Sequence, residues 1–377
     1  MRRYLNYLRE YMEPIAAFLT GFGDLLAGYI FALNISLVSR YPSILRLYPP
    51  FLSLRGTISG ILSGRLSTGL HVGSIEPKLF NNTWYFKILL SVQFIFSLLA
   101  SLFLSLLSLV VGANLFDILL VTMCVLGLSS LTIPLFTSFV AIYSFKRGLN
   151  PDVILYPIVS SVADLIVTYF YVSTLMFYKL KFFVLLLLPG LILISLSILF
   201  LWFYRDDEEF LGIIKEGALS MMSVSLIVTV TGIFLEKLVP EITPSILSIY
   251  PLLLTLVGDA GSIIGSLATT RIILGGFEGF VEYFDEYAVK ILRVLLSFLV
   301  AVLFYSALSC FITSSDLLST LIVVLPSSLL SFIMVLILSL GVATITFKLG
   351  LDPDTYVIPL ESSLADLFMT ISLLVFS

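Results

Sequence analysis

The stretch Ala141–Thr168, AIYSFKRGLNPDVILYPIVSSVADLIVT, recurs 202 residues later as Ala343–Thr370, ATITFKLGLDPDTYVIPLESSLADLFMT. Fourteen of the 28 aligned positions are identical. A second stretch, Ile44–Thr68, recurs at the same offset as Ile246–Thr270, with 9 identical positions of 25. The matches include polar residues that a lipid-facing helix does not need: Asp152/Asp354, Ser160/Ser362, Ser161/Ser363 and Asp164/Asp366. The chain is therefore expected to contain two copies of one structural unit.

The composition predicts an all-α polytopic membrane protein. Hydrophobic residues make up 59% of the chain and charged residues 12%, about half the usual share in soluble proteins. Apolar runs long enough to cross roughly 30 Å of hydrocarbon recur along the whole chain. A net charge of −4 indicates no nucleic-acid partner. No phosphate-binding loop and no hydrolytic or redox motif is present, so we expect neither an enzyme nor an ATP-driven pump.

The apolar segments divide into five spans per copy and one span between the copies. The linker helix matters because five helices alone would invert the second copy, whereas a sixth returns it to the same orientation. We therefore expect a first repeat at 1–180, a linker helix at 181–205 and a second repeat at 206–377. The alternative is a re-entrant linker, which would invert the second repeat. The eleven expected spans are 14–38, 43–70, 86–112, 115–145, 151–178, 182–204, 212–236, 244–272, 288–312, 317–347 and 353–377.

Charge placement predicts how this pseudo-dimeric monomer lies in the lipid bilayer, with a pseudo-two-fold axis along the membrane normal. With the N-terminus inside, the inside ends of the spans collect twelve Lys and Arg residues and the outside ends five, and such an excess marks the cytoplasmic side. We expect an integral protein of the cell membrane with a cytoplasmic N-terminus and an external C-terminus. The five basic residues expected outside are Arg40, Arg46, Lys179, Lys181 and Lys237.

Asp164 and Asp366 are the strongest candidates for function. Each lies in the middle of an expected span, where an ionised carboxylate costs roughly 2.5–3.5 kcal/mol on insertion scales. Ser160 and Ser362 share a helical face with them, although a serine there can also simply join helices. Two carboxylates facing each other across a two-fold axis suit a divalent cation, and oxygen ligands favour Mg²⁺, Mn²⁺ or Ca²⁺ over zinc.

A second group of candidates comes from the second span of each repeat and from positions where the repeats differ. Glycine clusters at 56–60 and 258–261 indicate either a broken or a closely packed helix. An unpaired buried Arg55 is improbable, so we expect a carboxylate beside it, with Asp24 as the first candidate and Glu361 as the second. The differences at the 202-residue offset include four that place an ionisable side chain in one repeat only: Asp24/Leu226, Arg55/Val257, Thr57/Asp259 and Val159/Glu361.

Two motifs resemble the MgtE-type magnesium channels and transporters. The segment from Tyr48, YPPFLSLRGTISG, is similar to the family's segment with a Gly-Asn-x-Gly core, and the Pro151 to Asp164 segment is similar to its fifth helix. The duplicated form resembles the eukaryotic solute-carrier relatives of the family. The resemblance implies Mg²⁺ as the ion and both aspartates as pore carboxylates. This chain differs by lacking cytosolic N-terminal and CBS domains, by Thr57 and Asp259 in place of the core asparagine, and by Arg55.

The first hypothesis is therefore transport of a divalent cation, Mg²⁺ or alternatively Mn²⁺, through a path at the interface between the repeats. A second is a Na⁺- or H⁺-coupled carrier of a small solute that uses the same carboxylates, and a third is a membrane scaffold. The small anionic stripe favours a bare or hydrated ion over a larger solute. The expected metal-site residues are Asp164, Asp366, Asp259, Ser160, Ser362, Glu361, Thr57 and Asp24.

Overall fold

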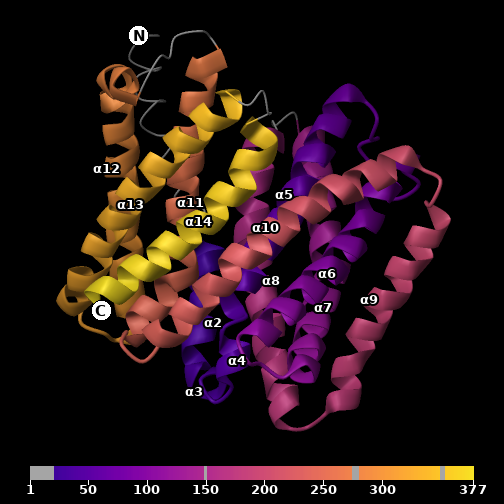
Figure 1. The fold of residues 1–377 in the computed structure, drawn as a ribbon, viewed down its shortest axis with the longest axis horizontal. Coiled ribbons are helices and arrows are strands. Elements are labelled where there is room, and N and C mark those ends of the chain that lie inside the picture. The colour runs from indigo at the N-terminus through magenta and orange to yellow at the C-terminus, as the bar shows by residue number, and fades with distance from the viewer. Residues whose placement is uncertain (1–20, 148–150, 274–279, 349–352) are drawn as a thin grey trace. The chain divides into compact units, whose positions relative to one another are not determined.

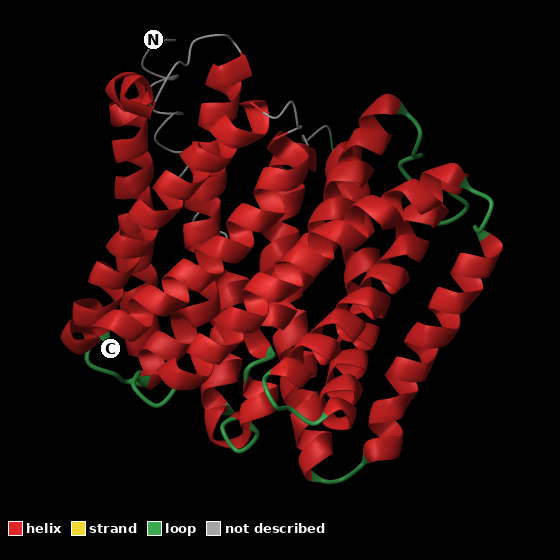
Figure 2. Cartoon of the chain, in the orientation of Figure 1, coloured by secondary structure: helices red, strands yellow, loops and turns green. Residues whose placement is uncertain are grey.

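A computed structural model describes the backbone of residues 21–147, 151–273, 280–348 and 353–377. Side chains are described for these residues except 151–157, 266–267, 269–273, 280–287, 343–348 and 353–360. Every secondary-structure element in these ranges is a helix (Figures 1 and 2). The helices are α2 (Phe22–Leu33), α3 (Ile35–Val38), α4 (Pro42–Leu45), α5 (Tyr48–Val72), α6 (Trp84–Val110), α7 (Leu115–Lys146), α8 (Pro151–Lys179), α9 (Phe183–Phe203), α10 (Glu208–Leu238), α11 (Pro244–Ile273), α12 (Phe280–Thr313), α13 (Leu317–Lys348) and α14 (Pro353–Phe376).

The expected span 43–70 is two helices, α4 and α5, whereas its counterpart in the second repeat is the single helix α11. Pro49 and Pro50 follow Tyr48, and two successive prolines remove two backbone donors, so an α-helix cannot continue through them. They fit the first turn of α5, where the N–H groups have no partner within the helix. The second repeat keeps only Pro251, and α11 runs through it.

The expected span 14–38 is likewise not one helix, because α2 ends at Leu33. Asn34 has φ −105° and ψ 9°, outside the helical region, and the four-residue helix α3 follows it. An asparagine side chain competes with the helix for backbone hydrogen bonds, which favours an end at this position. Residues 14–20 lie outside the described part of the chain.

Eight helical segments in the described part are long and apolar enough to cross a membrane. They come from α6, α7, α8, α9, α10, α11, α12 and α13. The linker α9 is one of them, with 21 residues and a mean hydropathy of 2.8. The expected spans at 14–38, 43–70 and 353–377 are not among the eight. In α5, Arg55, Arg65 and His71 lower the apolar character, so the total of eleven spans remains a prediction.

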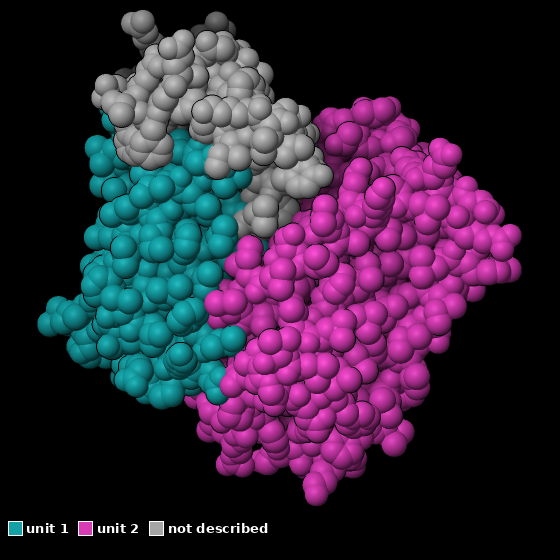
Figure 3. All heavy atoms as spheres, in the orientation of Figure 1, with its two compact units in different colours: residues 1–32, 233–377 teal, residues 33–232 magenta. Residues whose placement is uncertain are grey.

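The structure contains two compact units, and the sequence repeats do not coincide with them (Figure 3). Unit 2 holds residues 33–232, and unit 1 holds residues 1–32 and 233–377. Unit 2 thus carries α3 to α9 and most of α10, while unit 1 carries most of α2 together with α11 to α14. The repeat boundaries at 180 and 205 remain predictions about the sequence. Relative to these repeats, unit 1 contains most of the first helix of repeat 1, and unit 2 contains most of the first helix of repeat 2.

The first helix of each repeat packs with the helices of the other repeat. In unit 1, Phe22 of α2 lies against Phe304 and Tyr305 of α12, with ring centroids 6.3 and 5.5 Å apart. In unit 2, the Arg65 guanidinium of α5 donates to the Glu216 carboxylate of α10 at 2.9 Å. Each unit is therefore completed by one helix from the other repeat.

A glycine permits each of these two helix crossings. A Cβ on Gly28 of α2 would overlap the backbone carbonyl of Ser248 in α11. A Cβ on Gly232 of α10 would overlap the backbone carbonyl of Arg46. Ser248 follows Arg46 by 202 residues, the offset of the repeat, so both glycines cross equivalent points. Each first helix therefore crosses the other repeat at the equivalent backbone carbonyl.

Contacts between helix ends inside unit 2 agree with the predicted alternation of spans. At one end, Trp84 Nε1, at the start of α6, donates to Asp207 Oδ2 beyond α9 at 2.9 Å. This donor holds the pKa of the Asp207 carboxyl below its usual value. At the opposite end, the Arg46 guanidinium donates to the carbonyl of Val111, just after α6, at 3.2 Å. The start of α6 therefore lies beside the end of α9, and the end of α6 lies beside the start of α5; the layout of all the spans stays a prediction.

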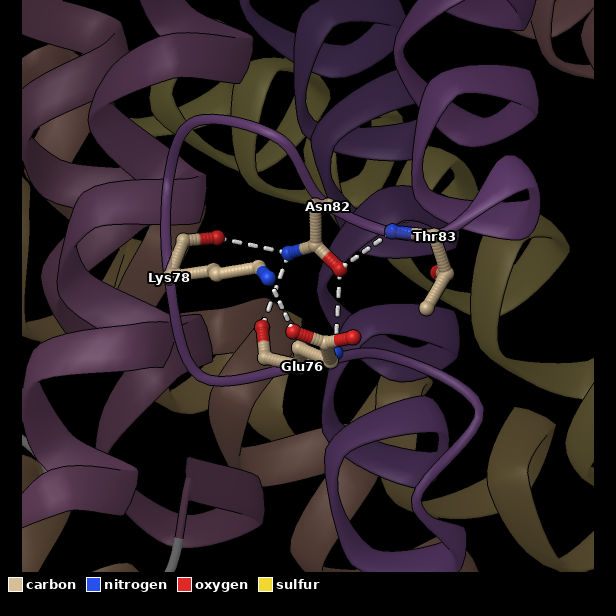
Figure 4. A network of polar contacts seen from close by, with 4 residues as sticks. All are labelled: Glu76, Lys78, Asn82 and Thr83. Atoms are coloured by element: carbon tan, nitrogen blue, oxygen red, sulfur yellow. Dashed lines mark hydrogen bonds and ion pairs between the residues drawn. The ribbon is translucent and has the colours of Figure 1, made fainter.

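The loop between α5 and α6 is held together by the side chain of Asn82 (Figure 4). Its Nδ2 donates to the carbonyls of Glu76 and Lys78 at 2.8 and 2.6 Å. Its Oδ1 accepts from the backbone amides of Glu76 and Thr83 at 3.0 and 2.7 Å. Glu76 and Lys78 also form an ion pair. The polar groups of Asn82 are thus committed to the loop itself, which fixes how α6 follows α5.

Candidate cation site

One hydrogen bond occurs in both repeats and joins the helices that carry the candidate residues. The hydroxyls of Tyr48 in α5 and Thr168 in α8 are 3.1 Å apart. Those of Tyr250 in α11 and Thr370 in α14 are 2.9 Å apart. The residues of the second pair follow those of the first by 202, so both repeats join their helices at the same point. We call each contact the tyrosine–threonine bond.

Each tyrosine–threonine bond lies one turn away from a candidate aspartate. Asp164 precedes Thr168 by four residues, and Asp366 precedes Thr370 by four. Both aspartates are 6% exposed, so the two repeats bury them equally. In unit 1 the Thr370 hydroxyl donates to the Asp366 carbonyl at 2.7 Å, so its oxygen accepts from Tyr250. The Asp366 carboxylate also lies within electrostatic range of the Tyr250 hydroxyl.

Further contacts in unit 1 set the register between α11 and α14. A Cβ on Gly258, eight residues after Tyr250, would lie 3.8 Å from the Ser362 hydroxyl, and Ser362 is eight residues before Thr370. The helices are therefore antiparallel and stay in contact over at least two turns. Asp259, half-buried and next to Gly258, thus lies at the level of Ser362. Four predicted site residues accordingly lie along one helix pair: Asp259, Glu361, Ser362 and Asp366.

The Glu361 carboxylate fills a space that two glycines leave open. A Cβ on Gly261 would lie 2.7 Å from Glu361 Oε1, and a Cβ on Gly265 would lie 3.1 Å from Oε2. The Ser339 hydroxyl of α13 donates to the same carboxylate, which is 1% exposed as a residue. Glu361 therefore inserts between α11 and α13, and any larger residue at either glycine would displace it.

The first repeat fills the equivalent space differently. Val159 stands in place of Glu361, and Ser59 and Ser63 stand in place of the two glycines; all three residues are buried. A shorter side chain from α8 is thus matched by larger ones from α5. Where one helix of the pair carries the larger side chain, the facing helix carries the smaller ones. The residues facing Glu361 are therefore small enough to make room for it.

The glycine clusters do not break the second span. α5 is continuous through 56–60 and α11 through 258–261, so the expected break is wrong and the expected close packing is correct for α11. Thr57 is half-buried, and its hydroxyl donates to the Ser53 carbonyl at 3.0 Å, which leaves its oxygen able to accept or ligate. Ser160 is half-buried on α8.

Arg55 and Asp24 lie in different units. Asp24 is fully buried on α2 in unit 1, within electrostatic range of Tyr305. Arg55 is fully buried on α5 in unit 2, and none of its three guanidinium nitrogens has a hydrogen-bond partner in the described part of the chain. Glu361 belongs to unit 1 as well. The expected pairing of Arg55 with either carboxylate therefore stays a prediction, and Arg55 has no carboxylate partner within the described part of its own unit.

The described side chains contain no cluster of three or more His, Cys, Asp or Glu residues that could hold a bare metal ion. The arrangement that the two units share is one buried aspartate, Asp164 or Asp366, four residues after a serine on the same helix. Such a sparse set of oxygen atoms suits an ion that keeps part of its water shell. Asp152 and Asp354 lie in the first turns of α8 and α14, and their side chains are outside the described set.

Two regions of the chain, residues 48–174 and 250–376, match the family model of MgtE, a divalent cation transporter. The regions begin at Tyr48, the first residue of α5, and at Tyr250, six residues after the start of α11, and together they cover more than half of the chain. This chain belongs to the MgtE family. The transporter is accordingly a multi-pass membrane protein that moves divalent cations, in a duplicated form of the family, as the motifs predicted. No curated protein and no solved structure matches the chain at a significant level.

Sequence reasoning missed two features of the site in this MgtE-family transporter. The tyrosine–threonine bond was present in the alignment, because Tyr48/Tyr250 and Thr168/Thr370 are identical pairs at the same offset. The fit of Glu361 onto two glycines also leaves a signal in the sequence: the side chain at position 159 becomes larger in the second repeat, while those at positions 59 and 63 become smaller. Both signals need the antiparallel register of the two helices, which the sequence alone does not supply.

Proposed function

We propose that this transporter carries Mg²⁺ across the cell membrane along a path lined by Asp164 and Asp366. The observation that carries the proposal is the matched pair of half-sites. Each repeat holds one aspartate at 6% exposure, one turn from a tyrosine–threonine bond. A buried carboxylate in a spanning helix is costly, and two at equivalent positions are unexplained by packing alone.

The ligand chemistry favours a hard divalent cation. The proposed ligands are carboxylate and hydroxyl oxygens, with Ser160 beside Asp164 and Ser362 beside Asp366. Mg²⁺ sheds water reluctantly and is usually held through one or two carboxylates and several waters, which matches a site with one aspartate from each repeat. Thiolate and imidazole, which favour zinc and copper, are missing from the proposed ligand set.

Further oxygen ligands are proposed at the positions where the repeats differ. Asp259 and Glu361 add two carboxylates to the α11–α14 pair, and Thr57 adds a hydroxyl to the α5–α8 pair. Asp24, buried in unit 1, is proposed as an additional negative charge that attracts the cation. The second repeat thus supplies most of the negative charge of the proposed path.

The orientation follows from the positive charges at the helix ends. We propose a cytoplasmic N-terminus, an external C-terminus and two parallel repeats joined by α9. The length and hydropathy of α9 support a spanning linker over a re-entrant one.

The test is Mg²⁺ flux into proteoliposomes that contain the purified protein, compared among wild type, Asp164→Asn and Asp366→Asn. Each substitution removes a charge from the path while keeping the side-chain shape. We expect flux to fall at least about tenfold in each variant, since a single charge at contact distance changes cation binding by more than that in a medium of low dielectric constant.

The matched control is Asp206→Asn, which removes an exposed aspartate that forms a surface ion pair with Arg205 at 3.1 Å. It should retain wild-type flux. Unchanged flux in both path variants would reject the site, and Mn²⁺ flux that exceeds Mg²⁺ flux at equal concentration would reject the choice of ion. A requirement for a Na⁺ or H⁺ gradient would identify a coupled carrier.

A further inference from the structure

Arg55 is a buried cation without a hydrogen-bond partner in the described membrane core. Its side chain is fully buried, and its three guanidinium nitrogens have no hydrogen-bond partner in the described part of the chain. The second repeat has Val257 at the equivalent position, so the helix packing does not require a cation there. A buried charge without a partner is costly, which indicates that Arg55 serves something other than packing.

The register of the helices places Arg55 at nearly the same level as the first half-site. Arg55 follows Tyr48 by seven residues and so lies about 20° from it around α5, on the face that contacts α8. Asp164 precedes Thr168 by four residues, about 40° around α8. Since α5 and α8 should share the antiparallel register of their counterparts, Arg55 and Asp164 differ in level by only about 4 to 5 Å. A guanidinium on its long stem can cover that distance.

The α5–α8 contact also leaves room at this level. A Cβ on Gly56, the residue after Arg55, would meet no atom within 4 Å. The equivalent Cβ on Gly258 in the second repeat would meet the Ser362 hydroxyl at 3.8 Å. The first helix pair is thus more open than the second beside the residue that carries the cation.

The two half-sites differ in formal charge, because one holds only carboxylates and the other holds a carboxylate and a cation. Along the central turns of α11 and α14 the described ionisable side chains are three carboxylates, Asp259, Glu361 and Asp366. Along the central turns of α5 and α8 they are one carboxylate, Asp164, and one guanidinium, Arg55. The other arginine of α5, Arg65, is already paired with Glu216.

We propose that Arg55 is a tethered cation that competes with the transported ion for Asp164. This inference rests on the proposed function, and it deepens it by making the two half-sites unequal. The second half-site binds the divalent cation tightly. The first half-site binds it weakly, because the ion must displace or approach a fixed positive charge. A path with one weak site releases the ion readily, whereas two strong sites would retain it.

The expected size of the effect follows from Coulomb's law. A unit charge and a divalent ion roughly 10 Å apart, at an effective dielectric constant of about 20, change binding by about a hundredfold, and water in the path reduces this to about tenfold. Arg55→Val, which restores the residue of the second repeat, should therefore lower the half-saturating Mg²⁺ concentration about tenfold. The reciprocal Val257→Arg should raise it by a similar factor.

The deciding measurement is a double-mutant cycle in proteoliposomes. Half-saturating Mg²⁺ concentrations are compared among wild type, Arg55→Val, Asp164→Asn and the double variant. If the arginine acts on Asp164, Arg55→Val should have less than twofold effect in the Asp164→Asn background. Arg65→Gln, which removes another arginine of the same helix, is the control and should leave the half-saturating concentration unchanged. Arg55→Gln replaces Arg55→Val if the latter is not recovered as a monodisperse protein.

Two results would overturn the inference while leaving the proposed function intact. One is an unchanged half-saturating concentration in a folded Arg55→Val protein that still transports Mg²⁺. The other is a tenfold effect of Arg55→Val that persists in the Asp164→Asn background but disappears with Asp24→Asn or Glu361→Gln, which would pair Arg55 with unit 1. A wild-type protein without any divalent cation flux would instead reject the proposed function itself.

Discussion

The helix pairs α5–α8 and α11–α14 start from the same sequence unit but keep different parts of it. Both retain the tyrosine–threonine bond and an aspartate at 6% exposure. They differ at the position where Glu361 replaces Val159, and the residues facing it change with it. The contact that holds the helices together is thus repeated, whereas the charge between them is not. Duplication within one chain allows this difference, because a homodimer must place the same residue on both sides of its axis.

The same comparison applies to the first helices. α2 and α10 each pack against helices of the other repeat. In each case a glycine of the helix lies against a backbone carbonyl of that repeat. This exchange is a symmetric feature that ties the two repeats into one folded protein.

The largest effect on stability is expected from the crossing glycines. Gly28→Ala and Gly232→Ala each add a Cβ that overlaps a backbone carbonyl oxygen. Unlike a side chain, the backbone cannot change rotamer to relieve the overlap. Each should lower the free energy of unfolding by about 3 kcal/mol or more, at the upper end of overpacking effects, and by the same amount in both repeats. Thermal unfolding in detergent, followed by fluorescence-detected size exclusion, measures the loss.

Gly212→Ala is the matched control, because a Cβ on this residue of α10 would meet no atom within 4 Å. Alanine favours a helix over glycine by about 1 kcal/mol, so this variant should be as stable as wild type or more stable. Equal stability of Gly212→Ala and Gly232→Ala would show that α10 does not cross at Gly232. A large loss in only one of the two crossing variants would show that the exchange is not symmetric.

A smaller loss is expected from transferring the residues of the first repeat to the second. Gly261→Ser together with Gly265→Ser inserts two side chains where the Glu361 carboxylate lies, and the first of them also overlaps Val335. The double variant should lose about 2 kcal/mol of stability. Adding Glu361→Val recreates the combination of Val159, Ser59 and Ser63, and it should recover at least half of that loss. The measurement is again the midpoint of thermal unfolding in detergent.

The comparison within this set is its own control. Glu361→Val alone should leave space above the two glycines, so it should be less stable than the triple variant. If the triple variant were no more stable than the double, the sizes of the facing residues would not be coupled across α11 and α14.

The sequence predicted the duplicated membrane fold because matches at a fixed offset survive without knowledge of contacts. Asp164 and Asp366 were found for the same reason, together with the cost of a charge in a spanning helix. The helix exchange was not predictable, because an offset aligns α2 with α10 but does not say which repeat each one packs on. Even the crossing glycines are hidden from the offset, since Gly28 corresponds to residue 230 and not to Gly232. The break before α5 was visible in Pro49-Pro50, but its absence from α11 shows that one proline is not enough.

The smallest effect is expected at the tyrosine–threonine bonds. Tyr48→Phe and Tyr250→Phe each remove one hydroxyl from a buried pair and leave the ring packing in place. Each should cost about 1 kcal/mol of stability, the usual worth of one hydrogen bond, and the two losses should agree because the bond is the same in both repeats. Transport should separate them: Tyr250 lies one turn from Asp366, in the half-site proposed to bind the ion more tightly, so Tyr250→Phe should raise the half-saturating Mg²⁺ concentration more than Tyr48→Phe. Equal changes in transport, at equal changes in stability, would contradict the inequality of the two half-sites and leave the bond as a purely structural contact.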